Sequence, residues 1–413
     1  MTATLAPPRD SGRVSGVLSS PLATYHVLMG VTALLLSLGL VMVLSASSVE
    51  SYKLFGSSFV LAQRQFMFAA GGVVLMLVVS RIPVRSVRRV AWLGLAVGLL
   101  LLVAVLVIGV SVAGQRNWIA LGGPFRFQPS EFAKLALVVW GADLLARKRP
   151  LLGDPRHLLI PLLPIGGLVV GLVLLEKDLG TALILLPIIA GLLFAAGAGF
   201  WVFGLLGVVA TAGIALLSMG ASYRMGRFAA WLNPDADPMG VGWQLTHARF
   251  AFAVGGWWGQ GLGASREKWG SLPEAHTDFI FAVVGEELGL VGTLVMLLLF
   301  AVLVLAALRL ARDSDDYFVQ LASTAIAAWI GVQTLLNLGA VLGVLPITGV
   351  PLPLVSYGGS SLLPTLIAMG LLMSFARQEP AARKALADRA RRRARSRATS
   401  RERRDAVGAD VAG

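Results

Sequence analysis

Long apolar stretches separated by short polar connections dominate the hydropathy pattern of this chain. Each has about the 20 residues that an α-helix needs to cross roughly 30 Å of hydrocarbon. The stretches lie at residues 24–46, 61–80, 90–110, 129–146, 158–175, 179–198, 200–219, 279–308, 318–345 and 350–376. The pattern therefore predicts an all-α polytopic membrane protein with about ten transmembrane helices.

Lysine and arginine cluster in the connections after the second, fourth and eighth stretches and in the C-terminal tail. Because cytoplasmic loops carry an excess of these residues, both termini are predicted to be cytoplasmic and loop 220–278 to lie outside. The first apolar run is longer than the core of a secretory signal, so we expect it to remain as a membrane span. This divides the chain into a cytoplasmic segment 1–23, a membrane domain 24–376 and a cytoplasmic tail 377–413. The basic residues of the connections are Arg81, Arg85, Arg88, Arg89, Arg147, Lys148, Arg149, Arg156, Arg309 and Arg312.

The outer loop 220–278 is too long for a simple connection, since loops of more than about 15 residues tend to be functional or disordered. Its composition is not that of a disordered segment, because it contains Trp231, Trp243, Trp257, Trp258 and Trp269. We expect parts of it to pack as amphipathic helices on the membrane face.

Composition narrows the function classes. The chain is 56% hydrophobic and 14% charged, which fits a membrane protein. It has no cysteine and four scattered histidines, which excludes disulfides and Cys/His zinc sites. Of the net charge of +13, a surplus of seven lies in residues 377–413, whose Arg-rich composition predicts disorder. We expect this tail to contact anionic lipid or an acidic cytoplasmic partner, and we expect no nucleic-acid partner.

Three ionisable residues, Glu274, His276 and Asp278, are crowded where the outer loop enters the eighth apolar stretch. Water access and local dielectric change together at such a boundary, so acid-base chemistry can be tuned there. A structural alternative is that Thr277 or Asp278 only caps the helix. Helical spacing would place Asp278 above a stripe of small residues that lets a neighbouring helix come close. The stripe comprises Ala282, Gly285, Gly289 and Gly292.

Two further acids, Glu286 and Glu287, lie about 12 Å deeper along the same predicted helix. Helical geometry turns them away from Asp278. Charged groups at that depth require partners or a function, and we favour structural pairing for at least one of them.

A second group of candidates lies in segment 128–134 (QPSEFAK), where Pro129, Glu131 and Lys134 suit the start of a helix. The structural interpretation is a well-formed helix start. In the functional interpretation, the Lys134 ammonium holds a phosphate. Other cations predicted on the outer face would suit a diphosphate leaving group: Arg64, Arg116, Arg126, Arg224 and Arg227.

A third group lies in the last apolar stretch, where two prolines and two adjacent glycines predict a broken helix. Broken backbone at membrane depth is tolerated where it lines a cavity, although a simple packing kink is the alternative. Its hydroxyl and N–H groups would bind substrate oxygens, and Asn337 would brace it. The candidate binding residues are Ser356, Tyr357, Gly358, Gly359 and Ser360.

Asp235 and Asp237 form an acidic pair in the outer loop. Such a pair could bind a divalent cation, Mg²⁺ or Mn²⁺, through oxygen ligands. So short a pattern also arises by chance.

Four motifs together resemble the SEDS family (shape, elongation, division, sporulation) of cell-wall glycosyltransferases. They are QPSEFAK at 128–134, LPEAHTDFIF at 272–281, GEELG at 285–289 and SYGGS at 356–360. The order and spacing match over about residues 24–377. The GEELG form, SASS at 45–48 and the basic tail are more similar to the division-type members than to the elongation-type members.

The resemblance implies polymerisation of lipid II at the outer face of the cytoplasmic membrane, during division at the septum. It places the family's essential aspartate on Asp278 and its important acid and base on Glu131 and Lys134. It implies a class B penicillin-binding protein transpeptidase and other division proteins as partners. The family's Arg in the second outer loop is shifted by one residue here, to Arg116, so its role as a phosphate contact does not carry over directly.

We hypothesise an inverting transfer in which Asp278 is the general base. Glu131 would orient Lys134, and Glu274 and His276 would position the substrate. Three alternatives remain open at this stage: a lipid II flippase or exporter, an elongation-type polymerase, and a division scaffold whose tail recruits partners.

Overall fold

The computed structural model describes residues 22–112, 114–120, 122, 126–219, 226, 229, 231–233, 240–379, 382 and 384. Almost all of the predicted cytoplasmic segment 1–23 and most of the tail 377–413 therefore lie outside the described residues. The same holds for four candidates of the outer loop: Arg224, Arg227, Asp235 and Asp237.

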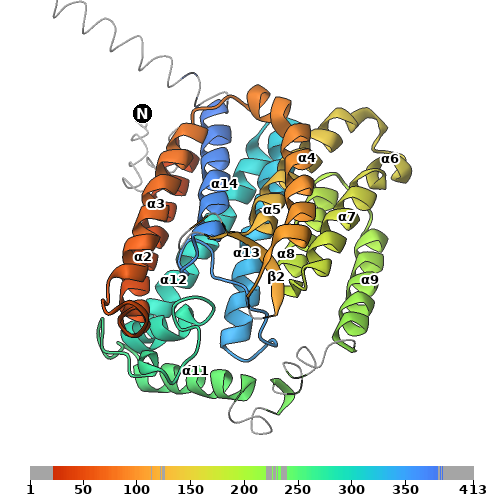
Figure 1. Cartoon of the computed structure of the whole chain (residues 1–413). Coiled ribbons are helices and arrows are strands. Elements are labelled where there is room, and N and C mark those ends of the chain that lie inside the picture. The colour runs from red at the N-terminus through yellow and green to blue at the C-terminus, as the bar shows by residue number, and fades with distance from the viewer. Residues whose placement is uncertain are drawn as a thin grey trace, which may run out of the picture.

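Long helices running side by side make up most of the molecule (Figure 1). In chain order they are α2 (Ala23–Phe55), α3 (Val60–Val79), α4 (Val84–Ile108), α5 (Pro129–Arg147), α6 (Pro155–Leu159), α7 (Leu162–Leu175), α8 (Leu179–Ala195), α9 (Phe200–Met219), α11 (Val241–Gly255), α12 (Ile280–Asp313), α13 (Tyr317–Val341) and α14 (Gly359–Gln378). Within the described ranges, 7 helices are long and apolar enough to cross a membrane, and two apolar helices are shorter. The predicted class, a helical multi-pass membrane protein, is confirmed, whereas the count of ten spans stays a prediction.

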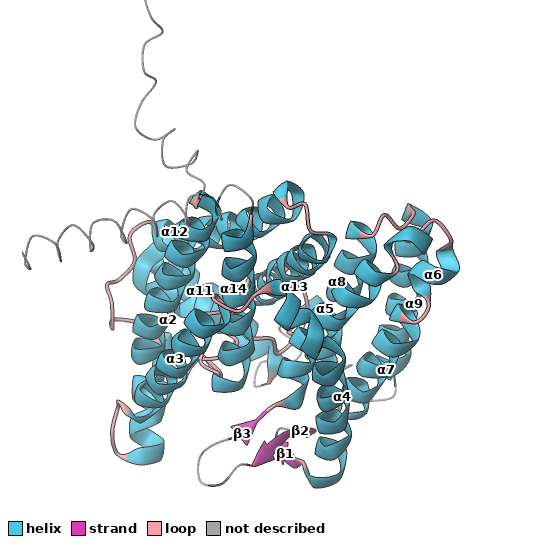
Figure 2. Cartoon of the chain, turned by 90° about the horizontal axis from the view of Figure 1, so that it is seen from above, coloured by secondary structure: helices cyan, strands magenta, loops and turns pink. Residues whose placement is uncertain are grey.

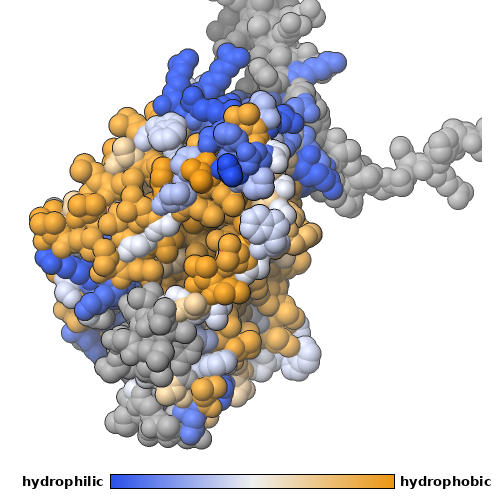
Figure 3. All heavy atoms as spheres, turned by 90° about the vertical axis from the view of Figure 1, so that its right-hand side faces the viewer, coloured by the Kyte–Doolittle hydropathy of each residue, from blue (hydrophilic) through white to orange (hydrophobic). Residues whose placement is uncertain are grey.

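On the face shown in Figure 3, apolar residues form a broad band, and hydrophilic residues are gathered most densely at one end. On α4, for example, Leu100 and Val107 are 69% and 70% exposed. Side chains of this kind on the outer surface of a helical bundle suit contact with lipid rather than water.

At the α4 start, Arg88 pairs at 2.8 Å with the fully buried Asp143, which also accepts from Arg147 at 2.6 Å.

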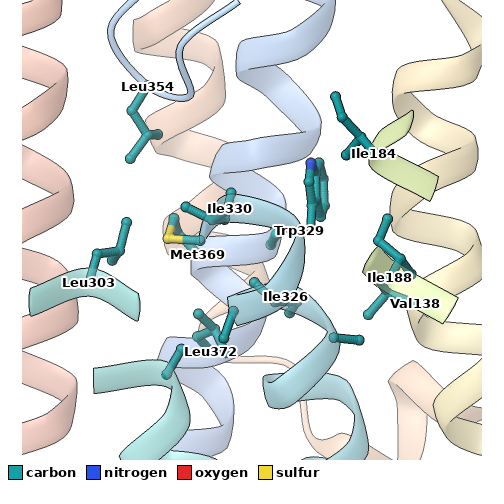
Figure 4. Close-up of a cluster of buried hydrophobic side chains, with 14 of the residues drawn as sticks. Val138, Ile184, Ile188, Leu303, Ile326, Trp329, Ile330, Leu354, Met369 and Leu372 are labelled. Carbon is teal, nitrogen blue, oxygen red and sulfur yellow. The ribbon is translucent and has the colours of Figure 1, made fainter. Parts of the chain in front are cut away.

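Helix α13 is the centre of the packed core (Figure 4). Its Trp329 is fully buried and faces the side of the core formed by α8 and α5. Ile326 and Ile330, on the same helix, pack toward α14 and α12. The core residues contributed by these neighbours include Val138, Ile184, Ile188, Leu303, Met369 and Leu372. This packing brings α5, α12, α13 and α14 together at the end of the bundle where the candidate residues lie.

A small antiparallel sheet, which the hydropathy pattern did not reveal, follows α4. Its strands are β1 (Val110–Val112), β2 (Gln115–Ala120) and β3 (Arg126–Phe127), in the order β1-β2-β3. Gly114 has φ +79° in the tight β1–β2 turn, a conformation that glycine adopts without steric cost. The strands are too short for a clear alternating pattern, and they lead directly into α5 (Figure 2).

Helix α12 is interrupted at Gly289, whose φ of 67° and ψ of −166° are not helical. The turn 256–261 of the outer loop lies against this interruption and satisfies its backbone groups. Leu290 N donates to Gly256 O at 2.9 Å, and Gln260 N donates to Glu286 O at 2.9 Å. A helix interrupted in this way needs such partners because lipid offers none. The prediction of one continuous helix through the small-residue stripe is therefore wrong.

The close approach that the small residues predicted does occur, but the neighbour is α11 of the outer loop. A Cβ on Gly285 would overlap the Phe252 ring, and a Cβ on Gly255 would overlap Gly285 O. Helix α11 also confirms that part of the outer loop is helical, and it lies across the end of the bundle (Figure 1).

Candidate functional site

Asp278 lies just before α12, and not on it as expected. The helix begins at Ile280 with Phe279 as its N-cap, so neither Thr277 nor Asp278 occupies the N-cap position considered for them. Asp278 is partly exposed. Its carbonyl oxygen accepts a 2.8 Å hydrogen bond from Asn337 Nδ2, which also donates to Val350 O at 2.7 Å. Asn337 thus braces the segment before α14, as predicted, and holds the Asp278 backbone to it.

The segment 350–358 between α13 and α14 is not helical, as the prolines and glycines predicted. It binds the loop 272–278 directly. Ser356 Oγ donates to Thr277 O at 2.6 Å, and Tyr357 N donates to His276 O at 2.9 Å. The serine hydroxyl also accepts from Leu352 N at 2.8 Å. Ser356 therefore uses its only hydroxyl proton to fix the loop.

Gln65 of α3 holds the other side of this segment. It is 1% exposed, donates from Nε2 to Ser356 O at 3.1 Å, and accepts from Gly358 N through Oε1 at 3.1 Å. An amide can satisfy one carbonyl and one N–H at the same time, so Gln65 fixes both backbone groups. The N–H of Gly358, expected to be available for substrate, is engaged here.

The predicted pair at the start of α5 is formed. Lys134 Nζ lies 2.9 Å from Glu131 Oε1, and Lys134 is fully buried with the Trp329 ring 5.2 Å away. Gln333 Oε1 accepts from Lys134 at 3.4 Å, and Gln333 Nε2 donates to Pro351 O at 2.8 Å. The pair is thus linked through Gln333 to segment 350–358.

Ser360 joins α14 to the entrance of α5. Its hydroxyl donates to Arg126 O at 3.0 Å and accepts from Gln128 N at 3.3 Å. Gln128 Nε2 in turn donates to Asp178 Oδ2 at 2.9 Å, which also accepts from Asn117 at 3.0 Å. Asp178 therefore ties the small sheet to the start of α5.

Glu176, just after α7, lies beside this cluster and is fully buried. Burial, with a smaller contribution from the Asp178 charge, raises the pKa of Glu176 to about 8. A carboxyl group shielded from water in this way is held in its neutral form at neutral pH.

Arg64 is a cation beside Tyr357. Its guanidinium lies 4.7 Å from the Phe55 ring centroid. Burial raises the pKa of Tyr357, while the charge and hydrogen bonding of Arg64 act in the opposite direction. Arg116 instead donates to Gly109 O at 2.9 Å and Val107 O at 2.7 Å, closing the end of α4. These two contacts use two of the five guanidinium N–H groups, so the others remain available to a phosphate.

His276 and Glu274 behave differently from each other. Glu274 is exposed and accepts from Thr277 Oγ1 at 2.6 Å. His276 is 6% exposed, with its Nδ1 3.2 Å from Glu50 Oε2 and its ring 5.3 Å from that of Tyr357. Of the two residues expected to position the substrate, His276 is therefore buried against its neighbours, whereas Glu274 is exposed.

Glu286 and Glu287 are structural, as favoured from the sequence. Glu286 accepts from Ser265 Oγ and Arg266 N, at 2.5 Å and 2.7 Å. Glu287 forms a 3.0 Å ion pair with Lys268 and accepts from Ser45 Oγ at 2.6 Å. These contacts attach the outer loop to α12 and α2.

Sequence reasoning missed several residues of this arrangement: Gln65, Asp178, Gln333 and Glu50. Each lies in or beside an apolar stretch, where burying a polar side chain costs free energy unless it has a partner. Their position could therefore have marked them as candidates.

No group of three or more His, Asp or Glu able to hold a metal occurs among the described residues.

Comparison with known proteins gives consistent results. Residues 25–381 match the family model for FtsW, RodA and SpoVE, described as cell cycle protein. A probable peptidoglycan glycosyltransferase FtsW of Mycobacterium tuberculosis is 43% identical over 382 residues, covering 92% of this chain and 72% of the relative. Stage V sporulation protein E of Bacillus subtilis is 38% identical over 353 residues, covering 85% and 96%.

Two solved structures share the fold. A chain from a peptidoglycan synthase complex, studied for the coordination of polymerisation and crosslinking, has TM-score 0.70 and 32% identity, with 86% of this chain and 97% of that chain covered. The rod shape determining protein RodA of Thermus thermophilus has TM-score 0.64 and 30% identity, with 86% and 96% covered.

Proposed function

Because the chain belongs to the FtsW, RodA and SpoVE family of cell cycle proteins, we propose that it is a peptidoglycan glycosyltransferase that polymerises lipid II at the outer face of the cytoplasmic membrane. One observation carries the proposal. Segment 350–360 holds both the loop that carries Asp278 and the start of α5, which carries Glu131 and Lys134. Three of the four family motifs, at 128–134, 272–281 and 356–360, thus meet in one hydrogen-bonded unit.

In this mechanism Asp278 is the general base. It takes the proton from the 4-hydroxyl of the acceptor GlcNAc as that oxygen attacks the anomeric carbon of the donor MurNAc. The undecaprenyl diphosphate leaves from the opposite face, which inverts the anomeric configuration. Asp278 suits this role because its side chain is partly exposed while its backbone is fixed by Asn337.

The diphosphate needs positive charge as it leaves. Among the described cations near the loop, Arg64 is well placed, because its partners are an aromatic ring and Tyr357 rather than a carboxylate. Lys134 is paired with Glu131 and fully buried, so we assign this pair to positioning α5. Arg116, Arg224 and Arg227 stay candidates for the same role.

The proposed partner is a class B penicillin-binding protein transpeptidase. The solved complex similar to this chain, which coordinates polymerisation and crosslinking, supports it. Curated relatives of about 40% identity carry the name FtsW, which favours a division role and hence a septal location over an elongation role. The end of the bundle that carries Arg88 and Arg147 would face the cytoplasm together with both termini.

Purified protein in detergent, supplied with labelled lipid II, tests the enzyme against the flippase alternative. Detergent removes the two sides of the membrane, so a transporter alone forms no glycan strand. We expect strands from the wild-type protein and none from Asp278→Asn, with equal thermal midpoints for both proteins. Undiminished strand synthesis by Asp278→Asn would exclude Asp278 as the base.

A further inference from the structure

The interaction between Glu50 and His276 lies beside the proposed reaction but has no part in it so far. Glu50 is on α2, one turn before that helix ends, and its side chain is 50% exposed. His276 is two residues before Asp278, and its side chain is 8% exposed. The two residues are 226 positions apart in sequence, so only the fold brings them together.

The Nδ1 atom of His276 is buried and lies 3.2 Å from Glu50 Oε2. Within the described part of the chain, Nδ1 has no other hydrogen-bond partner. A buried ring nitrogen without a partner is costly, and a small rotation of the half-exposed Glu50 side chain would align the contact. Glu50 is therefore the group that satisfies Nδ1.

The partner also decides which nitrogen carries the proton. An ionised carboxylate only accepts hydrogen bonds, so Nδ1 must be the donor. In a neutral imidazole, the hydrogen bond of one nitrogen leaves the other as an acceptor. Nδ1 is buried from solvent, whereas Nε2 is not, so Nε2 is the nitrogen that can contact a ligand.

The rest of His276 is fixed as well. Its carbonyl oxygen accepts from Tyr357 N, and its ring packs against the Tyr357 ring. Further charged groups around this point include Lys53 on α2, Arg64 on α3, and Glu274 and Asp278 on the same loop. With the backbone held on one side and Nδ1 held on the other, the ring has little freedom to turn.

From these contacts we propose that Glu50 is a positioning residue: it fixes His276 with Nε2 directed at the substrate, where Nε2 accepts a hydrogen bond from a sugar hydroxyl. This inference rests on the proposed function, because it assumes a sugar substrate beside Asp278. Glu50 acts only through His276 and does not touch the substrate.

A double-mutant cycle tests the proposal in the detergent polymerisation assay. His276→Gln keeps a polar group near the position of Nε2 but cannot contact Glu50 as Nδ1 does, so it serves as the second background. We expect Glu50→Ala to lower the rate about 10-fold in the wild-type background, as loss of an orienting partner does. In the His276→Gln background we expect no further loss. Equal losses in both backgrounds would show that Glu50 does not act through His276.

Conservative variants separate orientation from stability. The amide oxygen of Glu50→Gln can still accept from Nδ1, so we expect this variant to stay within about threefold of the wild-type rate. His276→Asn keeps a donor near Nδ1 but nothing near Nε2, and should be less active than His276→Gln. The reverse order would overturn the proposal. Tyr52→Phe, an exposed change on the same helix turn, is the matched control.

Lipid II binding, followed by tryptophan fluorescence, provides a second readout for variants with no measurable turnover. The affinity lost on Glu50→Ala should also vanish in the His276→Gln background, and its persistence there would contradict the proposal. Failure of the proposed function is distinguishable, because the wild-type protein would then form no strands at all.

Discussion

Ser356 Oγ donates a 2.6 Å hydrogen bond to the carbonyl oxygen of Thr277, the residue immediately before Asp278. The contact joins the segment before α14 to the loop before α12, across 79 residues of sequence. Because the hydroxyl also accepts from Leu352 N, it holds both segments in one arrangement. The serine thus fixes the backbone next to the proposed base.

Ser356→Ala should therefore reduce polymerisation more than it reduces stability. Loss of one such hydrogen bond costs about 1 kcal/mol of folding free energy. A misplaced base can cost about 10²-fold in rate, so we expect a rate loss of about 10-fold or more. Strand synthesis and thermal unfolding in detergent measure the two effects. Ser48→Ala, which removes a hydroxyl bonded within its own helix, is the control.

The buried ion pair between Lys268 and Glu287 should be essential for attaching the outer loop. Removing one partner leaves the other charge buried without compensation, which costs about 3–5 kcal/mol. We expect Lys268→Met to lower the thermal midpoint strongly. The double variant Lys268→Met with Glu287→Met should recover much of the loss, because no charge is left unpaired. A double variant as unstable as Lys268→Met would contradict this account.

Gly289→Ala should prevent normal packing of the outer loop. The residue has φ +67°, and a Cβ there would overlap Gly259 N and Trp257 O. Strained backbone of this kind costs on the order of 1–3 kcal/mol before the overlap is counted. Proteolysis of the outer loop should become faster. Gly94→Ala, on α4 with no atom within 4 Å of the added Cβ, should be neutral or slightly stabilising.

Stability should depend on pH through Glu176. Its pKa in the folded protein is about 8, above the ordinary glutamate value of 4.5, so the folded state holds a proton that the unfolded state loses first. Its contribution is therefore fully present below about pH 4.5 and declines as pH rises to about 8. Glu176→Gln should remove this part of the decline. Thermal midpoints of both proteins between these pH values measure the difference, and parallel curves would exclude the effect.

The sequence by itself determined the class of fold and most of the candidate motifs. Apolar stretches of membrane-spanning length are readable without a structure, because backbone groups in lipid must be satisfied within a helix. The pairing of Glu131 with Lys134 was also readable, since residues three positions apart share one face of a helix. Charged residues in the eighth stretch indicated buried partners because a charge at membrane depth is costly without one. Glu287 has such a partner in Lys268.

Only the tertiary structure decided how the motifs meet. Hydrogen bonds from Ser356 and Asn337 to the loop before α12 join residues far apart in the chain, and no local pattern encodes such pairs. The interruption at Gly289 depends on the outer-loop turn that supplies its backbone partners, and Glu50 reaches His276 only because α2 packs beside α12. Hydropathy indicates whether each segment prefers lipid or water. The site depends on which buried polar groups form hydrogen bonds with one another, and these pairs are made only by the fold.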